Sequence, residues 1–188
     1  MKNIVIFASG SGSNAEKIIE HLAPLNIAKI SQIYCNHAQA GVIERAKRLN
    51  IPYRIFQREE FKNGIILNEI QNQSTDLIIL AGFLWLIPKE FTEAFPQRII
   101  NLHPALLPKF GGKGMYGHFV HEAVVAAKEK ESGITIHFVN EHYDEGAIIF
   151  QSSFEVLSTD TAEKVAQKGQ FLEHRDFPRV IENWIREN

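Results

Sequence analysis

The sequence predicts an α/β protein with a doubly wound, mostly parallel sheet that carries helices on both faces. Short runs rich in β-branched and aromatic residues alternate with helical stretches five times, and such alternation produces crossover connections between parallel strands. Two of these runs, Ile4–Phe7 and Leu77–Leu80, are apolar at every position, as expected for strands that helices cover on both sides. We therefore expect these two strands at the centre of the sheet.

The remaining elements follow in order from the same alternation. The first half of the chain should consist of strands paired with helices: Asn3–Ala8 with Asn14–Leu22, Lys29–Cys35 with Gln39–Leu49, Tyr53–Phe56 with Glu59–Gln73, Asp76–Ala81 with Lys89–Ala94, and then the strand Arg98–Leu102. The second half should hold the glycine-rich loop Phe110–Gly117, a helix over His118–Lys130, strands over Ile134–Val139 and Ala147–Phe154, and a C-terminal helix. In that last helix, Phe177, Val180, Ile181, Trp184 and Ile185 fall on one face, which should pack against the core.

Composition limits the domain organisation and the classes of partner. A chain of 188 residues that is 45% hydrophobic can fill one core, so we expect a single domain over residues 1–188. Twenty basic and 22 acidic residues leave a net charge of −2 without long charged runs, which favours small-molecule ligands over nucleic acid or a membrane surface. The single Cys35 excludes an intrachain disulfide, and the N-terminal apolar run is too short for a signal peptide or membrane span. A cytoplasmic protein is the expectation.

Asn101 and His103 are the strongest indication of catalysis. They stand two residues apart where an apolar run meets Pro104, and alternate side chains of a strand point the same way. An amide N–H and an imidazole that converge on one point are suited to stabilise an oxyanion during acyl transfer. From these residues alone, a strand end followed by a turn is an equally good interpretation.

The loop after the first strand, Ala8–Ala15, indicates an anion site. It leads into a helix whose first N–H groups and dipole favour negative charge, Gly10 and Gly12 allow close approach, and Ser13 or Asn14 could cap the helix. The spacing also satisfies the dinucleotide pattern G-x-G-x-x-A, but no carboxylate follows the second strand to hold a ribose diol. A single phosphate is therefore the better prediction.

Four segments together resemble the folate-dependent formyltransferases, and among them most closely the phosphoribosylglycinamide formyltransferases. These segments are Gly10–Asn14, Leu80–Phe83, Asn101–Pro108, and Gly133–Val139 followed by Asp144. The resemblance covers nearly the whole chain and implies the Rossmann-like formyltransferase fold. It also implies that 10-formyltetrahydrofolate is the formyl donor, that glycinamide ribonucleotide is the acceptor, and that no metal takes part.

The resemblance assigns roles residue by residue. Asn101, His103 and Asp144 would be catalytic. The ribonucleotide would contact Gly12, Ser13, Asn14, Gln170 and Glu173. The folate would contact Leu84, Trp85, Leu86, Ile87 and Tyr143 in addition to Asn101 and Asp144, where some relatives have arginine in place of Trp85. Arg58 and Lys62 are both candidates for a basic partner of the phosphate, and the role of Phe110–Gly117 stays open.

A direct mechanism follows from these roles. The substrate amine would attack the formyl carbon and form a tetrahedral species without a covalent enzyme intermediate. We expect Asn101 to donate to the oxyanion and protonated His103 to act as second donor and acid, with Asp144 holding the imidazole charged and accepting the amine proton through water. His137 should support the catalytic face.

Three alternatives remain open from the sequence. A formyltetrahydrofolate hydrolase or another folate-dependent formyltransferase would use the same three residues, whereas a nucleotide-binding regulatory module would need none of them. The histidines show no metal-ligand spacing, because His118 and His121 form a pair without a third ligand. The sequence is compatible with either a monomer or a homodimer.

Overall fold

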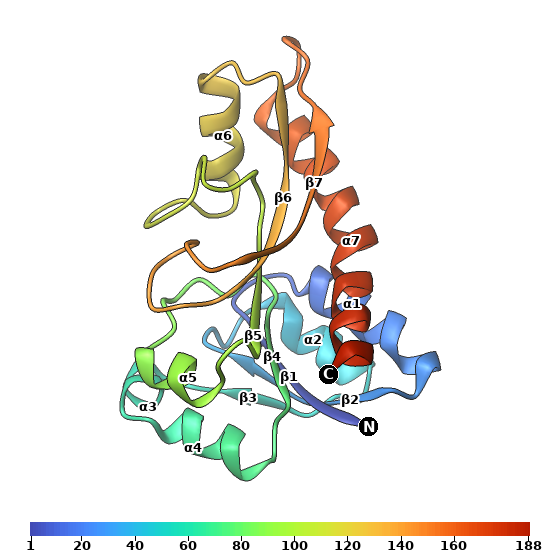
Figure 1. The fold of residues 1–188 in the computed structure, drawn as a ribbon, viewed down its shortest axis with the longest axis vertical. Helices are drawn as coiled ribbons and strands as arrows, with labels where there is room; N and C mark the ends of the chain where they lie inside the picture. Colours follow the sequence, from blue (N-terminus) through green and yellow to red (C-terminus); the bar gives the residue numbers. More distant parts are fainter.

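The computed structural model describes all residues from 1 to 188 and contains one seven-stranded sheet between two layers of helices (Figure 1). The strand order is β3-β2-β1-β4-β5-β6-β7, and β1 to β5 run parallel. The last two strands, β6 and β7, are antiparallel to their neighbours. The predicted doubly wound, mostly parallel sheet is confirmed, with β1 and β4 at its centre.

The elements lie close to their predicted positions. The strands are β1 Lys2–Ala8, β2 Ala28–Cys35, β3 Tyr53–Ile55, β4 Leu77–Leu80, β5 Ile99–His103, β6 Glu131–Phe138 and β7 Ile148–Glu155. The helices are α1 Ser13–Leu22, the 3-10 turn η1 Ala23–Leu25, α2 Gly41–Arg48, α3 Arg58–Lys62, α4 Ile65–Asn72, α5 Lys89–Ala94, α6 His118–Ala126 and α7 Ala162–Glu187. No helix is long and apolar enough to cross a membrane.

Two predicted helices were wrong in extent. The single helix expected over Glu59–Gln73 is two helices, α3 and α4, because Gly64 between them has φ 77°, which a right-handed helix cannot contain. The helix expected over His118–Lys130 ends at Ala126, and β6 begins at Glu131, earlier than predicted.

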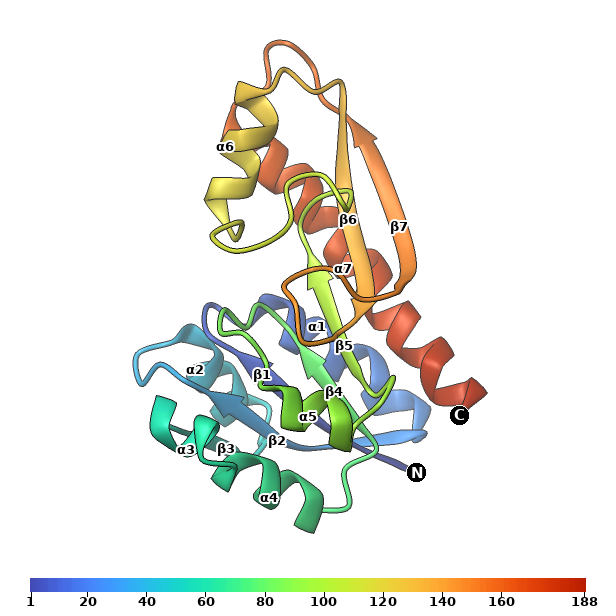
Figure 2. The same ribbon diagram turned by 60° about the vertical axis from the view of Figure 1, so that its left-hand side comes forward.

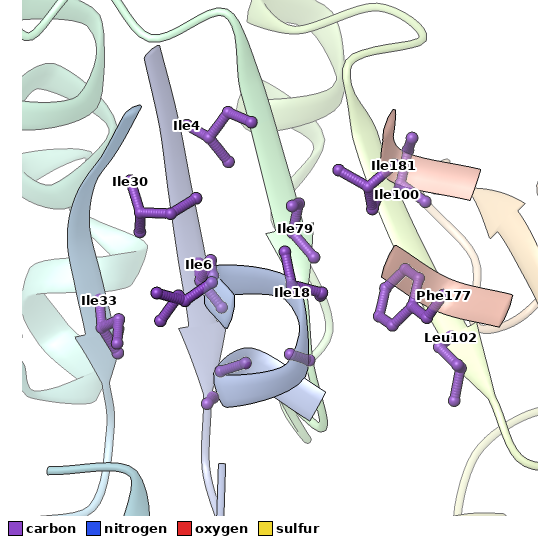
Figure 3. Close-up of a cluster of buried hydrophobic side chains, with 14 of the residues drawn as sticks. Ile4, Ile6, Ile18, Ile30, Ile33, Ile79, Ile100, Leu102, Phe177 and Ile181 are labelled. Carbon is purple, nitrogen blue, oxygen red and sulfur yellow. The ribbon is translucent and has the colours of Figure 1, made fainter. Parts of the chain in front are cut away.

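Alternate residues of the strands build two separate cores. Ile4, Ile6 and their counterparts on β2, β4 and β5 face α1 and α7, where Figure 3 shows Ile18, Phe177 and Ile181 packed over them. The intervening residues, such as Val5 and Phe7, face an aromatic-rich cluster under α3, α4 and α5. Helices on both sides of one sheet thus bury Ile4–Ala8 of β1 and every position of β4.

The strand order reverses at the boundary between β1 and β4. To one side lie β2 and β3, and to the other lie β5, β6 and β7. Ligands of open α/β sheets bind in the crevice at such a switch point, outside the carboxyl ends of the strands. In this protein β6, β7, α6 and the first half of α7 project beyond those ends (Figure 2), and His121 of α6, His137 of β6 and Glu173 of α7 line a cavity there.

Phe177 should be a principal contributor to stability because it packs α7 on the sheet and is completely buried. Phe177→Ala is expected to lower the free energy of unfolding by about 3–5 kcal/mol. Phe171→Ala on the same helix is the matched control, because that side chain is 67% exposed and its loss should change stability by less than about 0.5 kcal/mol. Urea denaturation of both variants measures the difference, and equal losses would show that α7 does not depend on this contact.

Candidate active site

Asn101 and His103 lie side by side at the carboxyl end of β5, as their spacing predicted. Leu102 between them points into the opposite core, so both polar side chains face the crevice side of the sheet. His103 is only 3% exposed and Asn101 is half-buried. The end of β5 therefore places an amide and an imidazole side by side on the crevice side of the sheet.

The antiparallel register of β5 and β6 adds a third polar group. Asn101 pairs with His137, and His103 pairs with Thr135. The Nδ1 of His137 lies 2.8 Å from the Phe138 carbonyl, which can only accept, so this nitrogen carries the proton. The Nε2 of His137 then accepts a hydrogen bond of 3.0 Å from Nδ2 of Asn101. This bond fixes the amide orientation and leaves the second N–H of Asn101 available.

Asp144 reaches the same cluster from the loop between β6 and β7. Its backbone has φ 57°, and a side chain at nearby Gly146 would collide with the Phe138 carbonyl, so the loop turns back tightly over the end of β6. One carboxylate oxygen accepts from the Gly112 N–H at 2.9 Å and lies 3.4 Å from Nδ1 of His103. The other oxygen lies 3.7 Å from Nε2 of His137.

Burial decides the charge states of this cluster. It lowers the pKa of His103 below its ordinary value, and the Asp144 charge and the hydrogen bond to the Phe110 carbonyl raise that pKa too little to compensate. Burial would raise the pKa of Asp144, but the nearby imidazoles of His137 and His103 and the Gly112 N–H outweigh it and lower that pKa. Burial therefore disfavours the charged His103 expected from the sequence, while Asp144 is ionised near pH 7, and the charge of His103 during the reaction stays a prediction.

The cluster opens into a cavity of about 500 Å³ at the switch point. All residues expected at the folate line this cavity: Asn101, Asp144, Tyr143, and the segment Leu84, Trp85, Leu86 and Ile87. A serine side chain holds the start of this segment, since Ser9 Oγ accepts a hydrogen bond from the Leu84 N–H at 3.1 Å. This end of the cavity is mainly apolar.

The other end of the cavity carries polar groups of α1 and α7. Nδ2 of Asn14 donates to a carboxylate oxygen of Glu173 at 2.6 Å, and both residues line the cavity. Burial raises the pKa of Glu173 against the opposing effect of that bond. Gly12, Ser13 and Gln170 do not line the cavity, and Gln170 is exposed.

The loop between β1 and α1 has the geometry of an anion site, with one correction. Neither Ser13 nor Asn14 caps α1: the N-cap is Gly12 itself, with φ 77° and no side-chain hydrogen bond. The first N–H groups of α1 consequently have no intrahelical or side-chain acceptor. A side chain at Gly12 would also collide with Val42 of α2.

Two residues of the site were missed from the sequence. His121 of α6 is 7% exposed and lines the cavity, and its Nδ1 has no hydrogen-bond partner. Burial is the main cause that lowers its pKa. The basic side chain that binds the loop is Arg45 of α2, which donates to the Ser11 carbonyl at 2.8 Å. Arg58, by contrast, lies over the Trp85 ring at 5.5 Å.

Comparison with known proteins identifies the family. The Formyl transferase family model matches residues 2–181, almost the whole chain. The chain belongs to the formyl transferase family. No group of three or more His, Cys, Asp or Glu side chains in this formyl transferase is arranged to hold a metal ion.

Individual relatives agree with that membership. The chain is 37% identical to phosphoribosylglycinamide formyltransferase of Bacillus subtilis over 98% of this chain and 95% of the relative. It is 40% identical to the chloroplastic phosphoribosylglycinamide formyltransferase of Arabidopsis thaliana over 96% of this chain, but spans only 64% of that relative's length. The crystal structure of glycinamide ribonucleotide transformylase 1 from Symbiobacterium toebii superposes with a TM-score of 0.91 at 30% identity, covering 100% of this chain and 89% of that one.

The effect of Asp144 on His103 can be measured directly. Because the carboxylate charge raises the pKa of His103 against burial, Asp144→Asn should lower that pKa further. An NMR titration of the imidazole resonances in both proteins measures the shift. An unchanged or higher His103 pKa in the variant would mean that the carboxylate does not act on this imidazole.

Proposed function

We propose that this protein transfers the formyl group of 10-formyltetrahydrofolate to the amine of glycinamide ribonucleotide, a step of de novo purine biosynthesis. The observation that carries the proposal is the cluster of Asn101, His103 and Asp144 between an apolar and a polar end of one cavity. A transferase must hold two different ligands with their reacting atoms in contact, and the cluster lies at the junction of the two ends.

The two ends suit the two ligands. A pterin ring fits against the apolar Leu84–Ile87 segment and Tyr143, with backbone groups of the segment free to meet its polar edge. The ribose hydroxyls fit the Asn14 and Glu173 pair, and the 5′-phosphate fits the uncapped N–H groups of α1. Gln170 is placed near this end by its position one turn before Glu173, and its contact with substrate stays a prediction.

The proposed reaction needs no net proton from solvent. As the amine nitrogen attacks the formyl carbon, the free N–H of Asn101 donates to the carbonyl oxygen on which negative charge collects. The amine loses one proton and N10 of the folate gains one as the bond between N10 and the formyl carbon breaks. A neutral His103 beside an ionised Asp144 can take up the first proton and return it to N10.

This role of His103 differs from the role inferred from the sequence in the protonation state with which the reaction begins. The imidazole begins neutral, acts first as a base, and becomes the acid in the second step. Its Nε2 donates to the Phe110 carbonyl at 2.8 Å, so the substrate amine must replace that carbonyl, and the proton on Nε2 must shift to Nδ1 beside Asp144 before Nε2 can accept a proton from the amine. His137 takes part only by holding the Asn101 amide.

A formyltetrahydrofolate hydrolase is the second candidate, because water could replace the amine at the same cluster. The Asn14 and Glu173 pair favours transfer, since a hydrolase would have no use for a polar ribonucleotide end.

We also propose a cytosolic location, which suits the single, buried, unpaired Cys35. The plant relative is named as chloroplastic.

The purified protein should formylate glycinamide ribonucleotide with 10-formyltetrahydrofolate as donor, after dialysis against a chelator and without added metal. Spectroscopic detection of tetrahydrofolate formation together with mass analysis of the ribonucleotide product measures the transfer. Formate release without formylated ribonucleotide would assign the protein to the hydrolases. Activity that disappears on chelation and returns with zinc would refute the metal-free mechanism.

His103 and Asp144 should behave as one catalytic unit, because both serve the same transferred proton. His103→Ala and Asp144→Asn are each expected to lower kcat by about 10²-fold or more, the scale of lost acid–base catalysis. The double variant should be little worse than the poorer single variant, since groups that act together are non-additive. Losses that multiply would show that the two residues act independently.

A further inference from the structure

We propose that Arg45 is a positioning residue that fixes the loop between β1 and α1 in its phosphate-binding shape. The inference rests on the proposed function, because it concerns the ribonucleotide end of the same site. Arg45 is remote in sequence from the loop and does not line the cavity. Its effect on binding would be exerted through the loop backbone.

The guanidinium of Arg45 forms hydrogen bonds on both sides of the loop. Nε of Arg45 donates to the Ser11 carbonyl at 2.8 Å, and Nη1 donates to the carboxylate of Glu16 in the first turn of α1. One planar group is thereby bonded to both sides of Gly12. Because a guanidinium holds its donors in a rigid fork, these two bonds fix the loop relative to the helix that follows it.

The start of α2 also packs against the loop. The Val42 N–H donates to the Gly10 carbonyl at 3.1 Å, and a side chain at Gly41 would lie 3.2 Å from the Ser11 carbonyl oxygen. The start of α2 therefore lies directly against Gly10 and Ser11. No other basic side chain forms a hydrogen bond with this loop, in which Gly12 has φ 77°.

Arg45 also compensates a negative charge close to the loop. Glu16 is only 7% exposed, and it belongs to the same first turn of α1 whose N–H groups would receive the phosphate. Arg45 and Arg48 both pair with it. The negative charge of Glu16 is thus compensated on the side of α2, and the N-terminus of α1 remains attractive to an anion.

The two arginines provide a matched comparison. Both bind Glu16, but only Arg45 binds the Ser11 carbonyl. A role confined to stability or to charge compensation predicts similar effects of Arg45→Ala and Arg48→Ala. A role in fixing the loop predicts that only Arg45→Ala impairs the ribonucleotide end.

The test measures steady-state kinetics for the wild type, Arg45→Ala and Arg48→Ala. Arg45→Ala should raise the KM for glycinamide ribonucleotide by about 10-fold, the effect of one lost hydrogen bond from a charged group. The KM for 10-formyltetrahydrofolate and kcat should stay within about twofold of the wild type, and Arg48→Ala should change none of the three by more than that. Equal increases in both KM values, or equal effects of the two variants, would overturn the proposal.

Calorimetric titration with ribose 5-phosphate separates this inference from the proposed function, because it requires no turnover. Binding should be weakened in Arg45→Ala and retained in Arg48→Ala, whichever acceptor the enzyme uses. Thermal unfolding controls for global stability, and Arg45→Lys, which keeps the charge but lacks the fork, serves if Arg45→Ala does not fold. Unchanged ribose 5-phosphate binding in a folded Arg45 variant would refute the proposal even if the wild type formylates glycinamide ribonucleotide.

Discussion

The antiparallel pairing of β6 with β5 is the constraint on which the catalytic cluster depends. If β6 ran parallel to β5, the carboxyl ends of both strands would lie at the same edge of the sheet. The antiparallel strand β6 instead begins beyond the carboxyl end of β5 and places His137, near its own carboxyl end, directly opposite Asn101. The following turn then has to come back over β5, and this return brings Asp144 onto His103.

The reversal of strand order between β1 and β4 forms the rest of the site. Adjacent strands β1 and β4 end at the same edge, but their connections diverge toward opposite faces of the sheet. The space between them is empty of backbone, so the loops after both strands can approach a ligand from two sides. The Ser9 hydroxyl bonds the two loops together at the Leu84 N–H, so the proposed phosphate and folate ends share one rigid base.

Local patterns predicted those features that depend on a short stretch of chain. The apolar runs located the strands, and the two-residue period placed Asn101 and His103 on one side. Arg45 was not predictable in the same way, because its partner Ser11 is 34 residues away and lies against it only through the packing of α2. His121 was missed for a similar reason: it is buried where α6 packs against α7, with its ring beside Gly169. The roles of the site residues still rest on the family resemblance and on chemistry.

The charge state of His103 shows why residue types alone were insufficient. A carboxylate 3.4 Å from an imidazole suggests a charged pair, and that effect is present. Burial acts on the same group with the opposite sign and is larger. An imidazole that was already protonated would have to release a proton before it could accept one from the amine. The neutral form can accept it at once, and the adjacent ionised Asp144 then stabilises the imidazolium until N10 takes the proton. Burial disfavours a protonated His103 in the resting site. His103 and Asp144 are therefore suited to carry a single proton from the amine nitrogen of the substrate to N10 of the folate.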